Sequence, residues 1–114
     1  MKRIDVINMF RCLGKIKLNK VEDRTLRNTL IADHLKMFRV AKENDDYIAS
    51  LREQFDPEAV KDVNEAYQKY AEEEVDIALE KIAKDAFGDV IAKGDIDFTL
   101  GELTLLEPMF KEED

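Results

Sequence analysis

The scarcity of helix-breaking residues constrains this chain more than any other feature. Between Gly14 and Gly88 there is no glycine and only one proline, Pro57. Because glycine and proline disfavour helix interiors more than any other residues, such a stretch favours long helices. We therefore expect a mainly α-helical fold whose longest helices are separated at Pro57.

Apolar residues before Pro57 recur with the spacing of one helix face. The residues of this seam are three or four positions apart: Leu26, Leu30, His34, Met37, Ala41, Asn44, Ile48, Leu51 and Phe55. This spacing predicts one long helix over residues 22–55 that packs along a single seam. Ile31, Leu35 and Phe38 widen the stripe in its first half, where we expect the helix to touch more than one neighbour.

The residues that follow indicate the start of a second helix. Asp56 suits an N-cap, Pro57 the first helical position and Glu58 the first turn. A turn of two or three residues brings the chain back antiparallel, so we expect a return helix over residues 57–74 or longer. Folding the hairpin at this turn aligns three pairs: Leu51 with Val60, Ile48 with Val63, and Asn44 with Tyr67.

Residues 72–83 fit two patterns. Their apolar residues can share one helix face, but Val75, Ile77 and Leu79 also alternate as in a strand. Helix propensity favours a continued helix. The alternative, a strand after Glu73 that pairs with residues 16–21, stays open.

Two shorter helical parts are expected at the ends of the chain. Residues 5–13 are amphipathic, and a left-handed glycine after them would end that helix. Residues 85–110 form a compact C-terminal part, with Asp85 capping a short helix. Thr99 and Glu102 then match a capping box that opens the last helix, which an internal proline shortens.

Length and charge limit the function classes. A chain of 114 residues suits a single domain and is too short for a barrel enzyme or a two-domain dinucleotide enzyme. The net charge is −8, but residues 1–20 carry +5 and residues 56–114 carry −12. An acidic chain is a poor general binder of nucleic acid, and we expect the basic segment to pack against the acidic half of its own fold.

Cysteine use and hydropathy indicate the compartment. The single cysteine, Cys12, cannot form an internal disulfide, which fits a reducing interior. The N-terminal residues lack the basic and apolar regions of a secretion signal, and no apolar run is long enough to span a bilayer. We expect a cytoplasmic protein.

Few residues could carry chemistry. His34 is the only histidine and lies on the seam, where packing explains it, and Cys12 is expected to be a buried, inert thiol. The acidic run at residues 72–76 lacks the glycine-containing loop of a calcium site. Neither Glu65 nor Glu72 has the histidine three positions on that di-iron bundles use. The sequence predicts no catalytic residue, no cofactor and no metal, and favours a non-enzymatic role.

A thin helical hairpin offers its surface rather than a pocket. Tyr47 and Tyr70 are the candidate partner-binding residues on that surface, since tyrosine is enriched at interfaces, and His34 is a third. We expect a protein partner or self-association and no membrane contact, and the charge does not favour nucleic acid as a partner.

The layout resembles small helical-hairpin proteins encoded in phage and prophage genomes. The resemblance rests on the helix at residues 4–13, the connector at residues 15–20 and the long helix at residues 26–55. It continues in the acidic run Glu72–Val75 and the leucine-rich segment Leu100–Phe110. It implies an accessory role in tail or virion assembly, in the host cytoplasm or the virion, and carries over no site residue.

The expected fold is thus mainly α, a long antiparallel helical hairpin with a short N-terminal helix and a small C-terminal helical subdomain. A minor two-stranded β element is allowed. The leading functional hypothesis is a non-enzymatic interaction or assembly protein. The alternatives are a regulatory or antitoxin-like module that binds protein or nucleic acid through the basic N-terminus, and a small enzyme or metal protein built on His34 and Cys12.

Overall fold

The structure, a computed structural model, describes residues 1–54, 56 and 58–111. Within these residues the chain is mainly helical, as predicted, and measures 49 × 29 × 24 Å. The α-helices are α1 (Arg3–Leu13), α2 (Arg24–Gln54), α3 (Val60–Glu72), α4 (Lys84–Gly94) and α5 (Leu100–Leu105), and the short 3-10 helices are η1 (Leu18–Lys20) and η2 (Glu107–Met109). No helix among the described residues is long and apolar enough to cross a bilayer.

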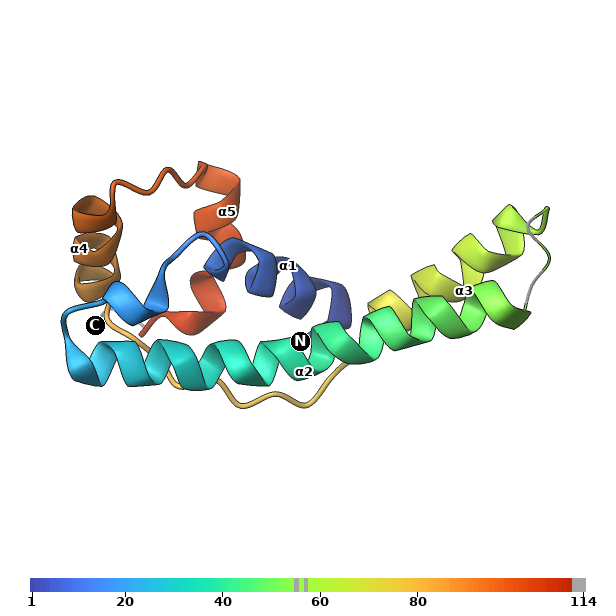
Figure 1. Ribbon diagram of the computed structural model, residues 1–114, viewed down its shortest axis with the longest axis horizontal. Helices are drawn as coiled ribbons and strands as arrows, with labels where there is room; N and C mark the ends of the chain where they lie inside the picture. Colours follow the sequence, from blue (N-terminus) through green and yellow to red (C-terminus); the bar gives the residue numbers. More distant parts are fainter. Residues whose placement is uncertain (55, 57, 112–114) are drawn as a thin grey trace.

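Helix α2 is the axis of the molecule and runs along most of its length (Figure 1). Asp23 caps its N-terminus, since its Oδ1 accepts a hydrogen bond from the Leu26 N–H at 3.1 Å. The seam residues Leu26, Leu30, Met37, Asn44 and Leu51 are buried, while Phe55, the last residue of the expected helix, lies outside the described residues. The seam spacing therefore predicted both the helix and its buried side.

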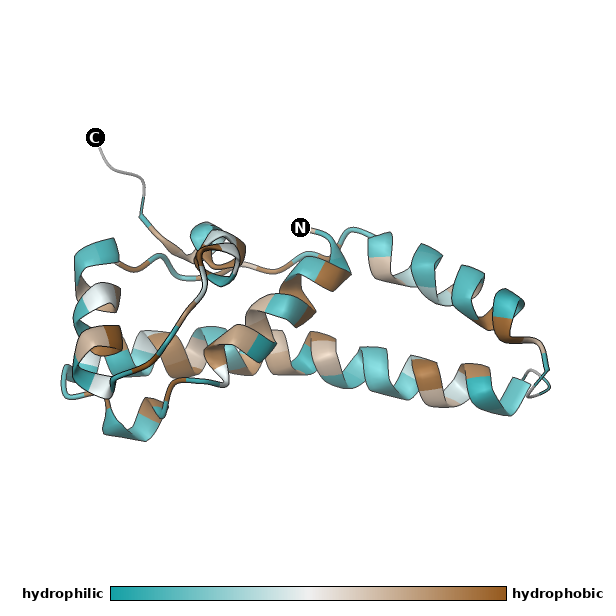
Figure 2. Ribbon diagram, turned by 90° about the horizontal axis from the view of Figure 1, so that it is seen from above, coloured by the Kyte–Doolittle hydropathy of each residue, from teal (hydrophilic) through white to brown (hydrophobic). Residues whose placement is uncertain are grey.

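The core lies in a head at one end of α2. Helix α1 packs on the first half of α2, and the C-terminal segments close over them (Figure 1). Seven core side chains have no accessible surface: Val6, Met9, Leu13, Leu30, Met37, Leu106 and Met109. Figure 2 shows hydrophobic residues gathered in this region, while α3 is mostly hydrophilic. The second half of α2 and α3 form a thinner stalk.

The stalk is antiparallel but not in the predicted register. Had Asn44 faced Tyr67, Tyr47 would lie opposite Asn64; instead the rings of Tyr47 and Tyr70 stack with centroids 3.9 Å apart. Val60, expected to pack on Leu51, is 58% exposed. The difference arises at the turn, because α3 begins at Val60 with Ala59 as its N-cap and not at residue 57.

Asp56, the expected N-cap of the return helix, therefore lies in the turn before α3. The backbone carbonyl of Asp56 accepts a hydrogen bond from the Ala59 N–H at 2.9 Å, which forms a turn before the helix starts. Pro57, expected at the first helical position, lies outside the described residues. A longer connection displaces every pair along the hairpin, which explains the altered register.

Residues 73–83 are extended, so the prediction of a continued helix is wrong. The segment leaves α3 at Glu73, whose ψ is 141°, and runs along α2 (Figure 1). The predicted alternation holds, with Val75, Ile77 and Leu79 half-buried and the residues between them exposed. We call residues 73–83 the strap.

The strap does not pair with residues 16–21, which contain η1 instead. Its β-bridges are isolated ones, between Lys2 and Glu74 and between Ile82 and Phe110, so the described residues contain no two-stranded element. Extended backbone that is not paired in a sheet must form its hydrogen bonds with other groups. In the middle of the strap, two side chains of α2, Asp33 and Lys36, are these partners.

The C-terminal part follows the prediction except at two caps. Thr99 and Glu102 form the predicted capping box at α5. Ala83, not Asp85, is the N-cap of α4. The left-handed residue is Asp95, with φ 49° and ψ 48°, whereas Gly14 is right-handed, with φ −60°. The glycine therefore predicted correctly where the first helix ends, but the residue with left-handed backbone is Asp95.

Ion pairs tie the basic N-terminal segment to the acidic half of the fold, as expected. The N-terminal ammonium contacts Glu74 at 2.7 Å, and Lys15 contacts Glu102 at the same distance. Arg3 contacts Glu73 at 3.2 Å. Solvent screens such surface pairs, so these contacts orient the segments more than they stabilise them.

A candidate protein-binding face on α2

An uncovered apolar strip runs along the first half of α2. Ile31, Leu35 and Phe38 repeat with spacings of four and three, so they lie on one side of the helix. Leu35 is 55% exposed and Phe38 47% exposed. The first half of α2 touches more than one neighbour, as expected, because α1 and the strap both pack against it. Leu35 and Phe38 nevertheless stay about half exposed, although Phe38 lies beside Phe10 of α1.

Phe10 of α1 extends the strip sideways. Its ring stacks on His34 with centroids 4.6 Å apart and planes at 22°, and lies 6.0 Å from the ring of Phe38. Phe10 and His34 are half-buried. We define the α2 face as the strip with its aromatic flank, namely Phe10, Ile31, His34, Leu35 and Phe38.

His34, a predicted partner-binding residue, lies within this face. Burial lowers the pKa of His34 because it disfavours the charged ring, so the imidazole is neutral at pH 7. Its Nδ1 is buried and has no hydrogen-bond partner among the described residues. The side chain therefore contributes packing against Phe10.

The charged surroundings of the α2 face are mainly basic. Arg24, Arg39 and Lys42 are exposed and are displaced from Leu35 by about whole numbers of turns, so they share its side of the helix. The exposed Asp46 meets the same condition and is the acidic residue on this side. The face is thus an apolar strip whose charged ends carry three basic residues and one acidic residue.

Tyr47 and Tyr70, the other predicted site residues, lie together where the stalk meets the head. Their rings stack at an interplanar angle of 18°. The guanidinium of Arg3 lies 3.9 Å from the centre of the Tyr70 ring, and its Nε donates to the Tyr70 carbonyl oxygen. Burial raises the pKa of Tyr70. The pair joins α2 to α3, and contact of these tyrosines with a partner stays a prediction.

Arg3 completes this junction. It is only 9% exposed, and it reaches Glu73 at 3.2 Å and Glu43 at 3.6 Å. It thereby connects α1, α2 and the start of the strap. Sequence reasoning counted Arg3 only as part of the basic segment, because its contacts lie far away in the chain.

Asp33 was missed as well. It is fully buried, and its Oδ1 accepts a hydrogen bond from the Glu80 N–H at 2.8 Å, while Oδ2 has no partner among the described residues. Lys36 donates to the Ala78 carbonyl oxygen at 2.6 Å. Burial raises the pKa of Asp33. The sequence contains a signal for this burial: Asp33 lies three residues after Leu30, and residues three apart share one side of a helix.

The chemically reactive candidates are not brought together. Cys12 is buried, and burial raises its thiol pKa. No group of three or more His, Cys, Asp or Glu side chains in the described part of the chain could hold a metal ion. The α2 face is therefore the feature on which a functional proposal can be built.

Comparison with known proteins adds nothing to this geometry: no protein-family model matches the chain, and neither a curated protein nor a solved structure is detectably similar to it.

Proposed function

We propose that this chain is a non-enzymatic protein-binding protein that holds an acidic amphipathic helix of a partner on its α2 face. The observation that carries the proposal is the exposure of Leu35 and Phe38, one helical turn apart and beside the Phe10 ring. Adjacent exposed apolar residues with a polar rim are typical of interaction sites. The other two large apolar residues that are exposed in the described part of the chain, Val60 and Leu100, lie on different helices.

The shape of the face supports a helical occupant. Residues at spacings of three and four along α2 form a ridge, and Phe10 on α1 provides a second wall beside it. An amphipathic helix can lay its apolar side along such a ridge and groove. Phe10, Phe38 and His34 would supply the aromatic contacts that dominate binding energy at protein interfaces.

The charge of the face supports an acidic partner and opposes a symmetric dimer. Arg24, Arg39 and Lys42 would meet acidic residues on an incoming helix, which steers association and selects the partner. Two copies of this face would each bring three basic residues against one acidic residue, so like charges would outnumber opposite charges in a dimer and would cost binding energy. The occupant is therefore assigned to a different protein.

The resemblance to phage and prophage hairpin proteins extends the proposal. It places the partner among the components that assemble a tail or virion. This extension rests on the sequence pattern alone, and the binding role of the α2 face does not depend on it.

Affinity capture with matched variants tests the proposal. The full chain, carrying a tag, is used to capture proteins from extracts of its source cells, in parallel with the double variant Leu35→Asp/Phe38→Asp and with Leu100→Asp. We expect a discrete partner with wild type and with Leu100→Asp, and loss of that partner with the double variant. Leu100 is the matched control because it is apolar and 82% exposed but lies on α5.

The captured partner must also contain an acidic amphipathic helix that binds the α2 face. A synthetic peptide of its acidic amphipathic helix should bind wild type at least about tenfold more tightly than the double variant, which corresponds to about 1.4 kcal/mol. Equal binding to both proteins would overturn the proposal, as would a partner without such a helix. A homodimer that the double variant dissolves would make a second copy the occupant and overturn the assignment to a different protein.

A further inference from the structure

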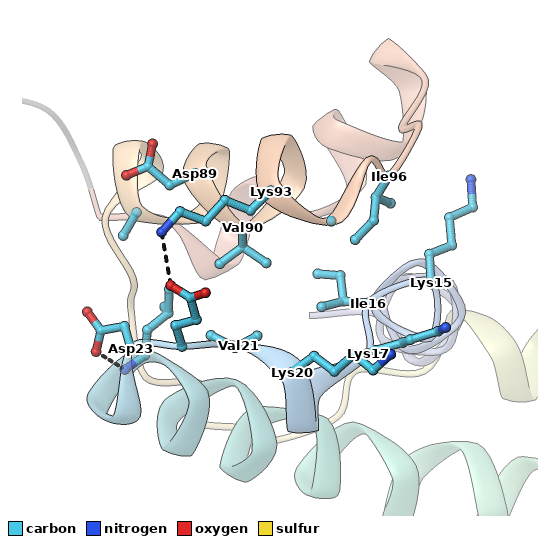
Figure 3. Close-up of a pocket in the computed structure, with 14 residues that line it drawn as sticks. Lys15, Ile16, Lys17, Lys20, Val21, Asp23, Asp89, Val90, Lys93 and Ile96 are labelled. Atoms are coloured by element: carbon cyan, nitrogen blue, oxygen red, sulfur yellow. Dashed lines mark hydrogen bonds and ion pairs between the residues drawn. The ribbon is translucent and has the colours of Figure 1, made fainter.

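A cavity of about 510 Å³ lies between residues 15–23 and α4, away from the α2 face (Figure 3). Its size falls in the range that binding sites for small molecules occupy, roughly 300–1,000 Å³. One wall comes from the connector and the start of α2, the other from α4 and the residue that follows its cap. Neither the helical hairpin nor the proposed function uses this space.

Four aliphatic side chains line the middle of the cavity. Ile16 and Val21 reach it from the connector, and Val90 and Ile96 reach it from the α4 side, so that the four side chains converge in Figure 3. Ile16 and Val21 also belong to the buried core, which fixes their positions. Val90 and Ile96 are half-buried and provide the accessible apolar surface. An aliphatic group would lose water contact between these walls.

The two ends of the cavity carry different charges. At one end Lys93 pairs with Glu22 at 3.3 Å, which links α4 to the start of α2. At the other end Lys17 and Lys20 are exposed and extend in the same direction, away from that pair (Figure 3). Both lysines lie close in sequence on the connector, so their ammonium groups can meet a single anion.

The remaining charged groups do not cancel this basic end. The ammonium of Lys15 is held by Glu102 at 2.7 Å. Asp23 uses a carboxylate oxygen to cap α2, and Asp89 points away from the cavity in Figure 3. The positive end therefore consists of Lys17 and Lys20.

We propose that this cavity binds a small anionic amphiphile, a single aliphatic chain of several carbons with a carboxylate at one end. The chain would lie among Ile16, Val21, Val90 and Ile96, and the carboxylate would meet Lys17 and Lys20. The site is independent of the proposed protein-binding role, because it shares no residue with the α2 face.

Titration of the full-length protein with three probes tests the site. Octanoate carries both the chain and the acid, acetate carries only the acid, and octyltrimethylammonium carries the chain with the opposite charge. We expect octanoate to bind with chemical-shift changes at the amides of Val21, Val90 and Ile96, and the other two probes to bind at least about tenfold more weakly. Octanoate affinity should also fall as salt concentration rises, because the lysine contacts are exposed.

Two double variants test whether Lys17 and Lys20 bind the carboxylate. Lys17→Gln/Lys20→Gln should weaken octanoate binding about tenfold, because both charge contacts with the carboxylate are lost. The control Lys61→Gln/Lys69→Gln removes the same charge from α3 and should leave the affinity unchanged. Val90→Phe, which fills the cavity, should abolish binding.

Three results would overturn the proposal. These are no octanoate binding at millimolar concentration, equal binding of octanoate and octyltrimethylammonium, and equal loss of affinity in the two lysine pairs. If Val90→Phe fails to fold, the lysine variants still decide the question, because their side chains are exposed and carry no core packing.

Discussion

Single buried polar residues have the clearest consequences in this molecule. Asn44 and Asp33 both lie on the buried side of α2, and each has an oxygen without a hydrogen-bond partner among the described residues. Such atoms cost stability because they lose water and gain nothing in return. Asp33 recovers part of this cost by holding the strap through Glu80. For Asn44, no described group pairs with its Oδ1.

Replacing Asn44 should therefore stabilise the protein. We expect Asn44→Leu to raise the free energy of unfolding by about 1 kcal/mol, because it removes the unpaired oxygen and adds apolar contact in the seam. Urea denaturation followed by circular dichroism measures the change. Asn28→Leu, the same change at an exposed position of α2, should stay within about 0.5 kcal/mol of wild type. A loss of stability in Asn44→Leu would show that the amide has a partner.

His34 should make stability depend on pH in one direction. Its pKa is lowered by burial in the folded protein, so the unfolded chain takes up a proton more readily. Stability is then fully present above about pH 6.5 and is lost as the pH falls below that value through the folded pKa. His34→Phe keeps an aromatic ring beside Phe10 and removes the titration.

Denaturant unfolding of wild type and His34→Phe between pH 8 and pH 5 measures this effect. We expect the variant to gain stability relative to wild type as the pH falls. The same pH dependence in both proteins would contradict the neutral, buried imidazole.

At the scale of the elements, periodicity predicted the helices because it reports local burial. The long helix, the short N-terminal helix and the capping box at Thr99 all follow from spacings within a few residues of sequence. The register of the hairpin does not follow from such spacings, because it depends on the length of the turn. The residues around Asp56 show where the turn lies but not how many residues it contains. An error of a few residues there displaces every pair along the stalk.

The strap shows the other limit of local reasoning. Propensity over residues 73–83 favours a helix, but Asp33 and Lys36 offer a donor and acceptor pattern that only extended backbone can use. These partners are more than forty positions away. The α2 face could not be predicted for the same reason: the sequence shows that Leu35 is apolar, but not that the described residues leave more than half of its surface exposed.

The end of α4 provides a test of backbone geometry. Asp95 adopts the left-handed conformation, which costs a non-glycine residue about 1 kcal/mol or more. We expect Asp95→Gly to raise the free energy of unfolding by up to about 1 kcal/mol in thermal or urea denaturation. Asp89→Gly, inside the same helix, should lower it by about 1 kcal/mol. Equal effects of the two substitutions would contradict the left-handed cap.

In the molecule as a whole, the first part of the chain is basic and the remainder is acidic. Residues 1–42 contain eleven Lys or Arg and four Asp or Glu, whereas the remainder contains seven and twenty-two. The basic part forms α1, η1 and the first half of α2, and the acidic part forms the second half of α2, α3, the strap and the C-terminal segments. The α2 face is therefore an apolar surface on the basic part of the chain, while the acidic stalk extends away from the head (Figure 1).

Site-specific photocrosslinking tests most directly whether that surface holds a partner. A photoreactive benzoylphenylalanine is placed at position 35 of the full chain, or at position 100 as the control, and the source cells are irradiated. We predict one discrete crosslinked protein from position 35 and none from position 100. Irradiation that yields no adduct at position 35, or the same adducts at both positions, would contradict the assignment of the α2 face.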